Sequence, residues 1–359
     1  MIEPLVSVIM PTFNVERVVA RGIESVVHQS CAAWEMIAVD DASTDGTIQR
    51  IEEYAKREKR IRAIRRDDNG GVSSARNIGL DASRGRFVLF LDADDWLEHD
   101  ALQQLVRCAE LGGTNAAAGA FAVCTSSDRC LHVHRHSRHS ICFGDLLARS
   151  YLHTSCHLMS RDAIGELRFD TSLDAYEDLE FWLRLAEHGV MWACTDEIIN
   201  AYCIHADGLS RRFLQMGDSC CRVLRAAARR TGSGDEGEVG VAGTCAHRML
   251  TYATRHVVVH GTSGIDEAWA ALREQIGEGI LIDVDAAASA AWFGVIFGLG
   301  EAPQERLRRD STLGAFASAW WERLVRENAA VEDLAERAWS LLSERGAQSC
   351  WTPGYASAG

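Results

Sequence analysis

Short apolar runs alternate with amphipathic segments over the first 97 residues of the chain. The runs at residues 5–10, 36–39, 61–64 and 87–91 are too short for helices and rich in strand formers, which predicts buried strands. Between them, apolar residues recur at helical spacing over 15–29, 47–59 and 72–83. This alternation predicts a parallel sheet with right-handed crossovers, whose ligand-binding loops gather along one edge.

The pattern is less regular after residue 97. A helix is expected over 100–111, and a final strand over 198–204 precedes His205. A buried helical face near residue 180 leaves Glu177 and Asp178 at the helix start, where acids also serve as caps. The remaining expected elements are strands at 117–125, 130–135 and 157–160 and short helices at 143–151 and 161–167.

From residue 211 the pattern is helical only, with a Gly-rich, acidic break at 231–240 that resembles a linker. We therefore expect an α/β domain over residues 1–212, a helical domain over 213–345 and a disordered tail over 346–359. The nearly uncharged stretch 286–300 is shorter than the roughly 20 apolar residues that span a bilayer. A buried helix is the main interpretation of this stretch, and shallow contact with a membrane is the alternative.

Composition excludes some function classes. The 359 residues include 37 basic and 51 acidic side chains, a net charge of -14, which argues against a nucleic-acid partner. Twelve cysteines are present without a Cys-x-x-Cys pair, and the chain enters a strand without a leader pattern. These features predict reduced thiols and a cytoplasmic protein.

Three aspartates, Asp92, Asp94 and Asp95, follow the apolar run 87–91. The carboxyl edge of an open α/β sheet is where such sheets bind ligands. A hard divalent cation bridging these carboxylates to a diphosphate would turn their mutual repulsion into binding. The alternative is an acidic cap for the helix that begins near residue 99. The stretch alone does not decide between the two.

Alternation over 130–136 places His132, His134 and His136 on one face of a strand. Three histidines at this spacing could bind zinc. The interleaved Arg135 and the nearby Arg138 favour a solvated, basic edge strand instead.

Four segments of the chain closely resemble the pattern of glycosyltransferase family 2, and they occur in the family's order. The later Glu177-Asp178 pair and Cys203-Ile204-His205 match the family's acid pair and terminal histidine region, so the resemblance covers residues 4 to about 210. The four segments are Val6-Ser7-Val8-Ile9-Met10-Pro11-Thr12-Phe13-Asn14, Val39-Asp40-Asp41-Ala42-Ser43-Thr44-Asp45-Gly46-Thr47, Gly71-Val72-Ser73-Ser74-Ala75-Arg76-Asn77-Ile78-Gly79 and Phe90-Leu91-Asp92-Ala93-Asp94-Asp95.

The resemblance implies a GT-A fold, Rossmann-like with a mostly parallel sheet, that binds a nucleotide-diphosphate sugar. It implies that Asp178 is the catalytic base and that Mn²⁺ or Mg²⁺ is bound by Asp94 and Asp92, with Asp95 in support and His205 as a further metal or diphosphate contact. The alternative for His205 is a structural role. The substrate-binding residues that it implies are Pro11, Thr12, Asn14, Asp41 for the base, Arg76, Asp92 and Glu177.

Two departures from the family pattern narrow the expected function. Cys203 stands where the family often has Arg, and the Gln-x-x-Arg-Trp motif of processive synthases does not follow His205. The resemblance then implies an inverting enzyme that moves one sugar, with a UDP-sugar as the expected donor. A glycan, a lipid-linked molecule or a small molecule would be the acceptor, in bacterial polysaccharide, envelope-glycan or glycosylated-metabolite synthesis. A non-catalytic sugar-nucleotide-binding module and a sugar nucleotidyltransferase are the alternatives.

Overall fold

The fold comes from a computed structural model, which describes residues 3–125, 130–136, 138–148, 152–204 and 212–232, with scattered residues between 241 and 271. The chain divides into two compact units, Met1–Cys203 and Ile204–Gly359. His205, the stretch 286–300, the tail 346–359 and nearly all of the expected helical domain lie outside the described residues. Within the described part, no helix combines the length and apolarity that crossing a bilayer requires.

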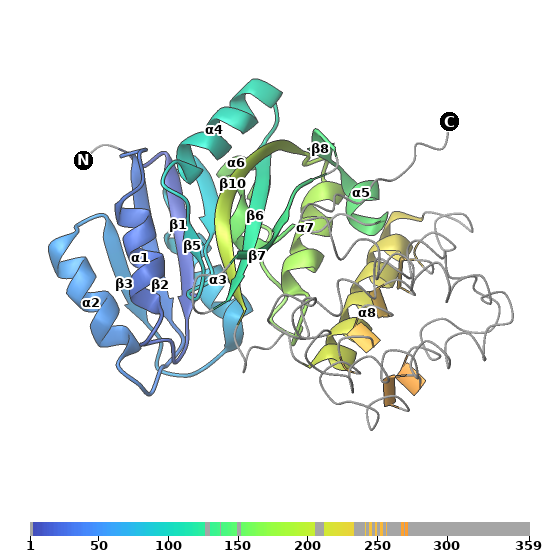
Figure 1. Ribbon diagram of the computed structural model, residues 1–359, viewed down its shortest axis with the longest axis horizontal. Coiled ribbons are helices and arrows are strands. Elements are labelled where there is room, and N and C mark those ends of the chain that lie inside the picture. Colours follow the sequence, from blue (N-terminus) through green and yellow to red (C-terminus); the bar gives the residue numbers. More distant parts are fainter. Residues whose placement is uncertain are drawn as a thin grey trace, which may run out of the picture. The chain divides into compact units, whose positions relative to one another are not determined.

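The first unit is built on one mixed sheet of ten described strands (Figure 1). Its parallel part has the order β3-β2-β1-β4, and a helix joins each of these strands to the next one along the chain. The strands are β1 (Val6–Thr12), β2 (Trp34–Asp40), β3 (Ile61–Arg65) and β4 (Phe87–Phe90), and the crossover helices are α1 (Val19–Val27), α2 (Thr47–Arg57) and α3 (Gly71–Ala82). All seven residues of β1 and of β2 are buried, as a parallel strand covered on both faces should be.

The remaining strands are antiparallel, so the sheet is less parallel than the sequence indicates. The order continues from β4 through β9, β6 and β10 to β5, with β7 paired to β6 and β8 to β10. These strands are β5 (Trp96–Leu97), β6 (Ala116–Thr125), β7 (Cys130–His134), β8 (Ser140–Ile141), β9 (His157–Ser160) and β10 (Trp192–Ile204). The α/β fold class expected from the sequence is confirmed.

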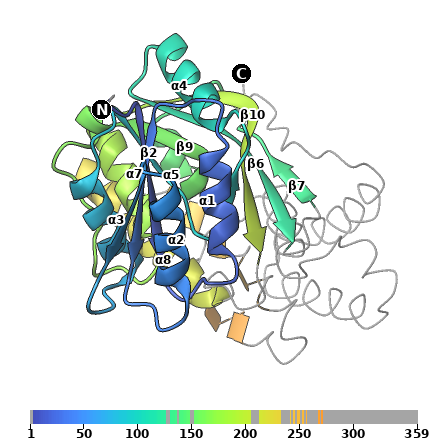
Figure 2. The same cartoon turned by 90° about the vertical axis from the view of Figure 1, so that its left-hand side faces the viewer.

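Helices cover both faces of the parallel part. Figure 2 shows α1 and α2 side by side on one face, with α3 toward the other. Gly79 of α3 packs directly on Ile9 of β1, where a Cβ at Gly79 would collide with the isoleucine side chain. The other described helices of this unit are α4 (Ala101–Gly112), α5 (Phe143–Ala148), the single-turn η1 (Thr154–Cys156), α6 (Arg161–Ile164) and α7 (Glu177–Glu187).

The second unit contains α8 (Phe213–Thr231), which begins where the sequence predicts the all-helical region. Its apolar positions include Cys220, Val223, Leu224 and Ala227, all buried. The helix ends at Gly232, whose φ of 62° gives the left-handed conformation that terminates many helices.

Candidate functional site

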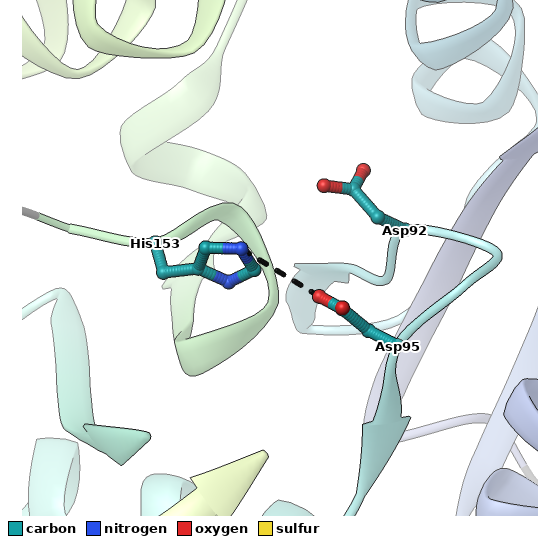
Figure 3. A group of neighbouring side chains, drawn as sticks. All are labelled: Asp92, Asp95 and His153. Carbon is teal, nitrogen blue, oxygen red and sulfur yellow. Dashed lines mark ion pairs between the residues drawn. The ribbon is translucent and has the colours of Figure 1, made fainter. Parts of the chain in front are cut away.

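Two aspartates and a histidine meet at the carboxyl end of β4. Asp92 and Asp95 lie on the loop between β4 and β5, and His153 is the N-cap of η1. One potential ligand atom from each of the three residues lies within 4.8 Å of the others. Figure 3 shows the imidazole facing the two carboxylates from the opposite side. A chain segment from residue 153 thus completes a cluster that starts at the acidic sheet edge.

The His153 ring is buried, which lowers its pKa to about 4 and keeps the ring neutral at pH 7. Its Nδ1 accepts a hydrogen bond from the Ser155 amide at 3.3 Å, and its Nε2 lies 3.6 Å from Asp95 Oδ2. A neutral imidazole has a lone pair to offer a metal. Metal binding through Nε2 would require the ring proton to move to Nδ1, at the cost of the bond from Ser155.

Asp95 is 1% exposed and joins three segments of the chain. It accepts hydrogen bonds from the Ser155 hydroxyl at 2.7 Å and from the Cys203 amide on β10 at 3.1 Å. Burial, followed by the charges of Asp94 and Asp92, raises the pKa of Asp95 well above its usual range. A divalent cation bound here would offset the burial and the repulsion that disfavour the ionised form of this carboxyl.

The aspartates do not cap a helix. The N-cap of α4 is Asp100, which makes no side-chain capping bond, and β5 separates this helix from the three aspartates. The capping interpretation of the acidic run is therefore wrong.

The residues present fit Mn²⁺ or Mg²⁺. Carboxylate oxygens suit both ions, and a histidine nitrogen favours Mn²⁺ over the harder Mg²⁺. Asp94, an expected ligand, is half-buried on the same loop but is not one of the three clustered residues. His153 was not identified from the sequence because the segment 152–156 has no periodic pattern. The one indication was a histidine shortly before an expected strand.

The acid pair begins α7. Tyr176, the N-cap, has a φ of 62°, which is unusual for a residue with a side chain and turns the chain sharply into the helix. Glu177 accepts a hydrogen bond from Arg76 at 2.7 Å. Asp178 accepts bonds from the Leu179 amide at 2.7 Å and the Thr154 hydroxyl at 3.1 Å. The two acids therefore have different partners.

The environment of Asp178 raises its pKa to about 6. Burial is the largest cause, and the neighbouring charge of Glu177 adds to it. Arg76 and the hydrogen bonds from Leu179 and Thr154 act in the opposite direction. A carboxyl with this pKa is ionised at neutral pH yet basic enough to accept a proton.

Arg76 connects the acid pair to the metal cluster. Its Nη2 donates to Asp92 at 2.9 Å while Nη1 donates to Glu177, and its side chain is 3% exposed. The sequence includes Arg76 among the residues that bind substrate, but it gives no indication of this pair of contacts.

Asp41 lies just beyond the end of β2 and is also buried. Its Oδ1 accepts hydrogen bonds from Arg66 Nη1 at 2.6 Å and from the Gly70 amide at 3.0 Å. Its Oδ2 accepts one from the Gly71 amide at 2.7 Å. The loop before α3 therefore wraps around this carboxylate.

Three other expected substrate residues hold the sheet edge together. Pro11 is buried in β1, and the Thr12 hydroxyl donates to the Val39 carbonyl at 3.2 Å. Asn14, with a φ of 52°, accepts a hydrogen bond from the Thr44 amide at 2.9 Å. Phe13, between them, is 48% exposed, so its ring is the apolar surface that this loop presents to solvent.

Among the described strands β7 pairs only with β6, as the expected edge strand would, and Arg135 after it is exposed, but His132, His134 and the following His136 are half-buried and not solvated. Burial lowers the pKa of His132 and of His136, whose Nε2 lies 3.1 Å from the Gly119 carbonyl oxygen. His134 stacks on Phe121 with ring centroids 4.9 Å apart. Among the described residues these histidines form no metal cluster.

Comparison with known proteins gives a consistent result. The family model described as Glycosyl transferase family 2 matches residues 7–168. Over 187 residues the chain is 30% identical to the "Putative teichuronic acid biosynthesis glycosyltransferase TuaG" of Bacillus subtilis (strain 168). That match covers 52% of this chain and 74% of the relative.

Solved structures of two proteins share the fold. The S. aureus TarS 1-349 complex with UDP-GlcNAc matches with a TM-score of 0.58 and 18% identity, covering 85% of this chain and 91% of that one. In a longer TarS structure, the chain spans 55% of the protein. The Pyrobaculum calidifontis mannosyltransferase PcManGT, in complex with GDP-Man and Mn²⁺, matches with a TM-score of 0.55 and 19% identity. This match covers 88% of this chain and 86% of the mannosyltransferase.

Proposed function

Because the chain belongs to glycosyl transferase family 2 and has a GT-A fold, we propose that it moves one sugar from a nucleotide-diphosphate sugar to a hydroxyl acceptor. The observation that carries this proposal is that a metal-ligand cluster and a half-buried acid of raised pKa, Asp178, are linked through Arg76. The relative in teichuronic acid biosynthesis supports a bacterial cell-envelope glycan as the acceptor.

Asp41 supports a uracil base in the donor. A carboxylate offers about four lone pairs, and Arg66, Gly70 and Gly71 already use three of them, both on Oδ1 and one on Oδ2. Uracil needs one acceptor for its single ring N–H, whereas the Watson–Crick edge of guanine has two donor groups that would need both oxygens. Since the Asp41 side chain is 4% exposed, a base can approach only one edge of it.

Asp92, Asp95 and His153 would hold the metal, with Asp94 as the further ligand expected from the sequence. When bound, the ion would neutralise the diphosphate and stabilise the departing nucleotide. Arg76 binds one oxygen of Asp92, which leaves the other for the cation.

Asp178 is the proposed base. Glu177 accepts a charged hydrogen bond from Arg76 through its Oε1, whereas the described partners of Asp178 are an amide and a hydroxyl. The pKa of Asp178, about 6, suits proton abstraction. Asp178 would remove the proton from the acceptor hydroxyl as that oxygen attacks the anomeric carbon opposite the leaving group. A single displacement of this kind inverts the anomeric configuration.

The test is a panel of UDP-, GDP- and dTDP-sugars, each added to the native chain with Mn²⁺ and with EDTA, with thermal unfolding as the measurement. A ligand that binds only the folded state raises the melting temperature by mass action. We expect stabilisation by UDP-sugars that is lost with EDTA. Stabilisation by GDP-sugars alone would contradict the uracil assignment, and stabilisation by none would contradict the proposed function.

A further inference from the structure

The Arg76 guanidinium lies between two acidic residues from distant parts of the sequence. One terminal nitrogen donates to Glu177 on α7 at 2.7 Å and the other to Asp92 on the β4–β5 loop at 2.9 Å. With 3% of the side chain exposed, little of this cation is open to a ligand. These contacts are typical of a residue that orients neighbouring side chains, here those of Glu177 and Asp92.

The surroundings fix the orientation of this guanidinium. Its central carbon lies 5.3 Å from the ring centroid of Phe169, which stacks on Phe181 at 4.2 Å. Asn77, the next residue on α3, holds the Phe169 backbone with two hydrogen bonds of 3.0 and 2.8 Å. Adjacent side chains of α3 therefore anchor both the guanidinium and the ring beside it. The planar fork of an arginine in such a setting loses little freedom on binding two carboxylates.

We infer that Arg76 is a positioning residue that sets the geometry of the two halves of the reaction together. By holding Asp92 it orients the donor and metal side, and by holding Glu177 it orients the acid pair that faces the acceptor. This inference rests on the proposed function and replaces direct substrate binding as the role of Arg76. Displacing reacting groups by about 1 Å can lower turnover by roughly 10²-fold.

The test compares Arg76→Gln and Arg76→Lys with the native chain. The turnover number is measured with the UDP-sugar that the panel identifies, and the dissociation constant of UDP is measured by calorimetry in Mn²⁺. We expect Arg76→Gln to lower turnover by roughly 10²-fold and to change UDP affinity by less than about threefold. Lysine keeps the charge but not the fork, so Arg76→Lys should stay about tenfold below native turnover.

Arg86→Gln is the matched control, since Arg86 pairs with Glu110 at 3.1 Å on an exposed surface. It should leave both measurements unchanged. The effect of Arg76→Gln should also be at least about fivefold smaller in a Glu177→Gln background, because partners in one network are not additive. If Arg76→Gln lowered turnover equally in both backgrounds, Arg76 would not act through Glu177.

Two results would overturn the inference as a whole. One is UDP affinity weakened tenfold or more with near-native turnover, which would make Arg76 a substrate-binding residue. The other is native turnover in Arg76→Lys, which would show that a charge without the fork suffices and which can be read even if Arg76→Gln fails to fold. Failure of the proposed function would appear separately, as absence of sugar-nucleotide binding by the native chain.

Discussion

Lowering the pH from 7 to 5 should reduce the turnover number roughly tenfold through Asp178. Burial first, and then the charge of Glu177, raises the pKa of Asp178 from 3.8 to about 6. A carboxyl with that pKa is roughly nine-tenths ionised at pH 7 and one-tenth ionised at pH 5. Only the ionised form can accept the acceptor's proton, so turnover should fall on the acid side with a midpoint near pH 6.

Two variants assign this midpoint to a residue. Glu177→Gln removes the neighbouring negative charge, so the pKa of Asp178 should fall and the acid limb should move to lower pH. Turnover at neutral pH should fall by about fivefold or more through the lost contact with Arg76, but it should not be abolished. Asp178→Asn keeps the shape of the side chain but removes its basicity. It should lower turnover by roughly 10²–10⁴-fold and abolish the acid limb.

Initial rates would be measured from pH 4.5 to 8 with saturating UDP-sugar and Mn²⁺. Binding of UDP would be checked at each pH, because burial also raises the pKa of Asp95 in the metal cluster. Native turnover in Asp178→Asn would refute the assignment. An inactive but folded Glu177→Gln beside an active Asp178→Asn would transfer the role of base to Glu177.

Three further predictions concern Asp178, Asp94 and Gly79. The raised pKa of Asp178 favours the folded state below about pH 4, and this contribution is lost as the pH rises through about 6. The shift in pKa corresponds to roughly 3 kcal/mol, so Asp178→Asn, which carries no charge, should raise the melting temperature at pH 7. A lower melting temperature for Asp178→Asn would contradict the burial argument. Asp94→Asn should abolish the Mn²⁺-dependent stabilisation by UDP-sugars; if only Asp95→Asn does so, the cluster binds metal without Asp94. Gly79→Ala forces a methyl group against β1 and should reduce the free energy of unfolding by about 1–3 kcal/mol, whereas Gly144→Ala, which meets nothing within 4 Å, should change it little; equal effects in denaturant titrations would count against the packing argument.

The parallel half of the sheet could be predicted because its elements have strong periodic patterns. The run 36–39 is apolar throughout and lies within β2, and α2 was expected over 47–59 and spans Thr47–Arg57. Such segments are buried on one or two faces, so the pattern of apolar residues determines their structure. The acidic run after β4 could be placed at the sheet edge for the same reason.

The antiparallel half was harder to predict. Strand β10 begins at Trp192, six residues before the expected 198, because its first residues mix polar and apolar types without alternation. Strand β5 has two residues, too few for any periodic signal. Long-range hydrogen bonds, such as those of Asp95 to Ser155 and Cys203, fix this region, and they have no local sequence signature. The same holds for His153, whose place in the site depends on tertiary contacts.

The anomeric configuration of the product tests the central claim most directly. A UDP-α-sugar would be incubated with the native chain, Mn²⁺ and a hydroxyl acceptor, or with water alone when the acceptor is withheld, and the first product would be identified by proton NMR before any mutarotation. A single displacement driven by Asp178 predicts the β-anomer as the first product. An α-anomer would contradict the proposed mechanism.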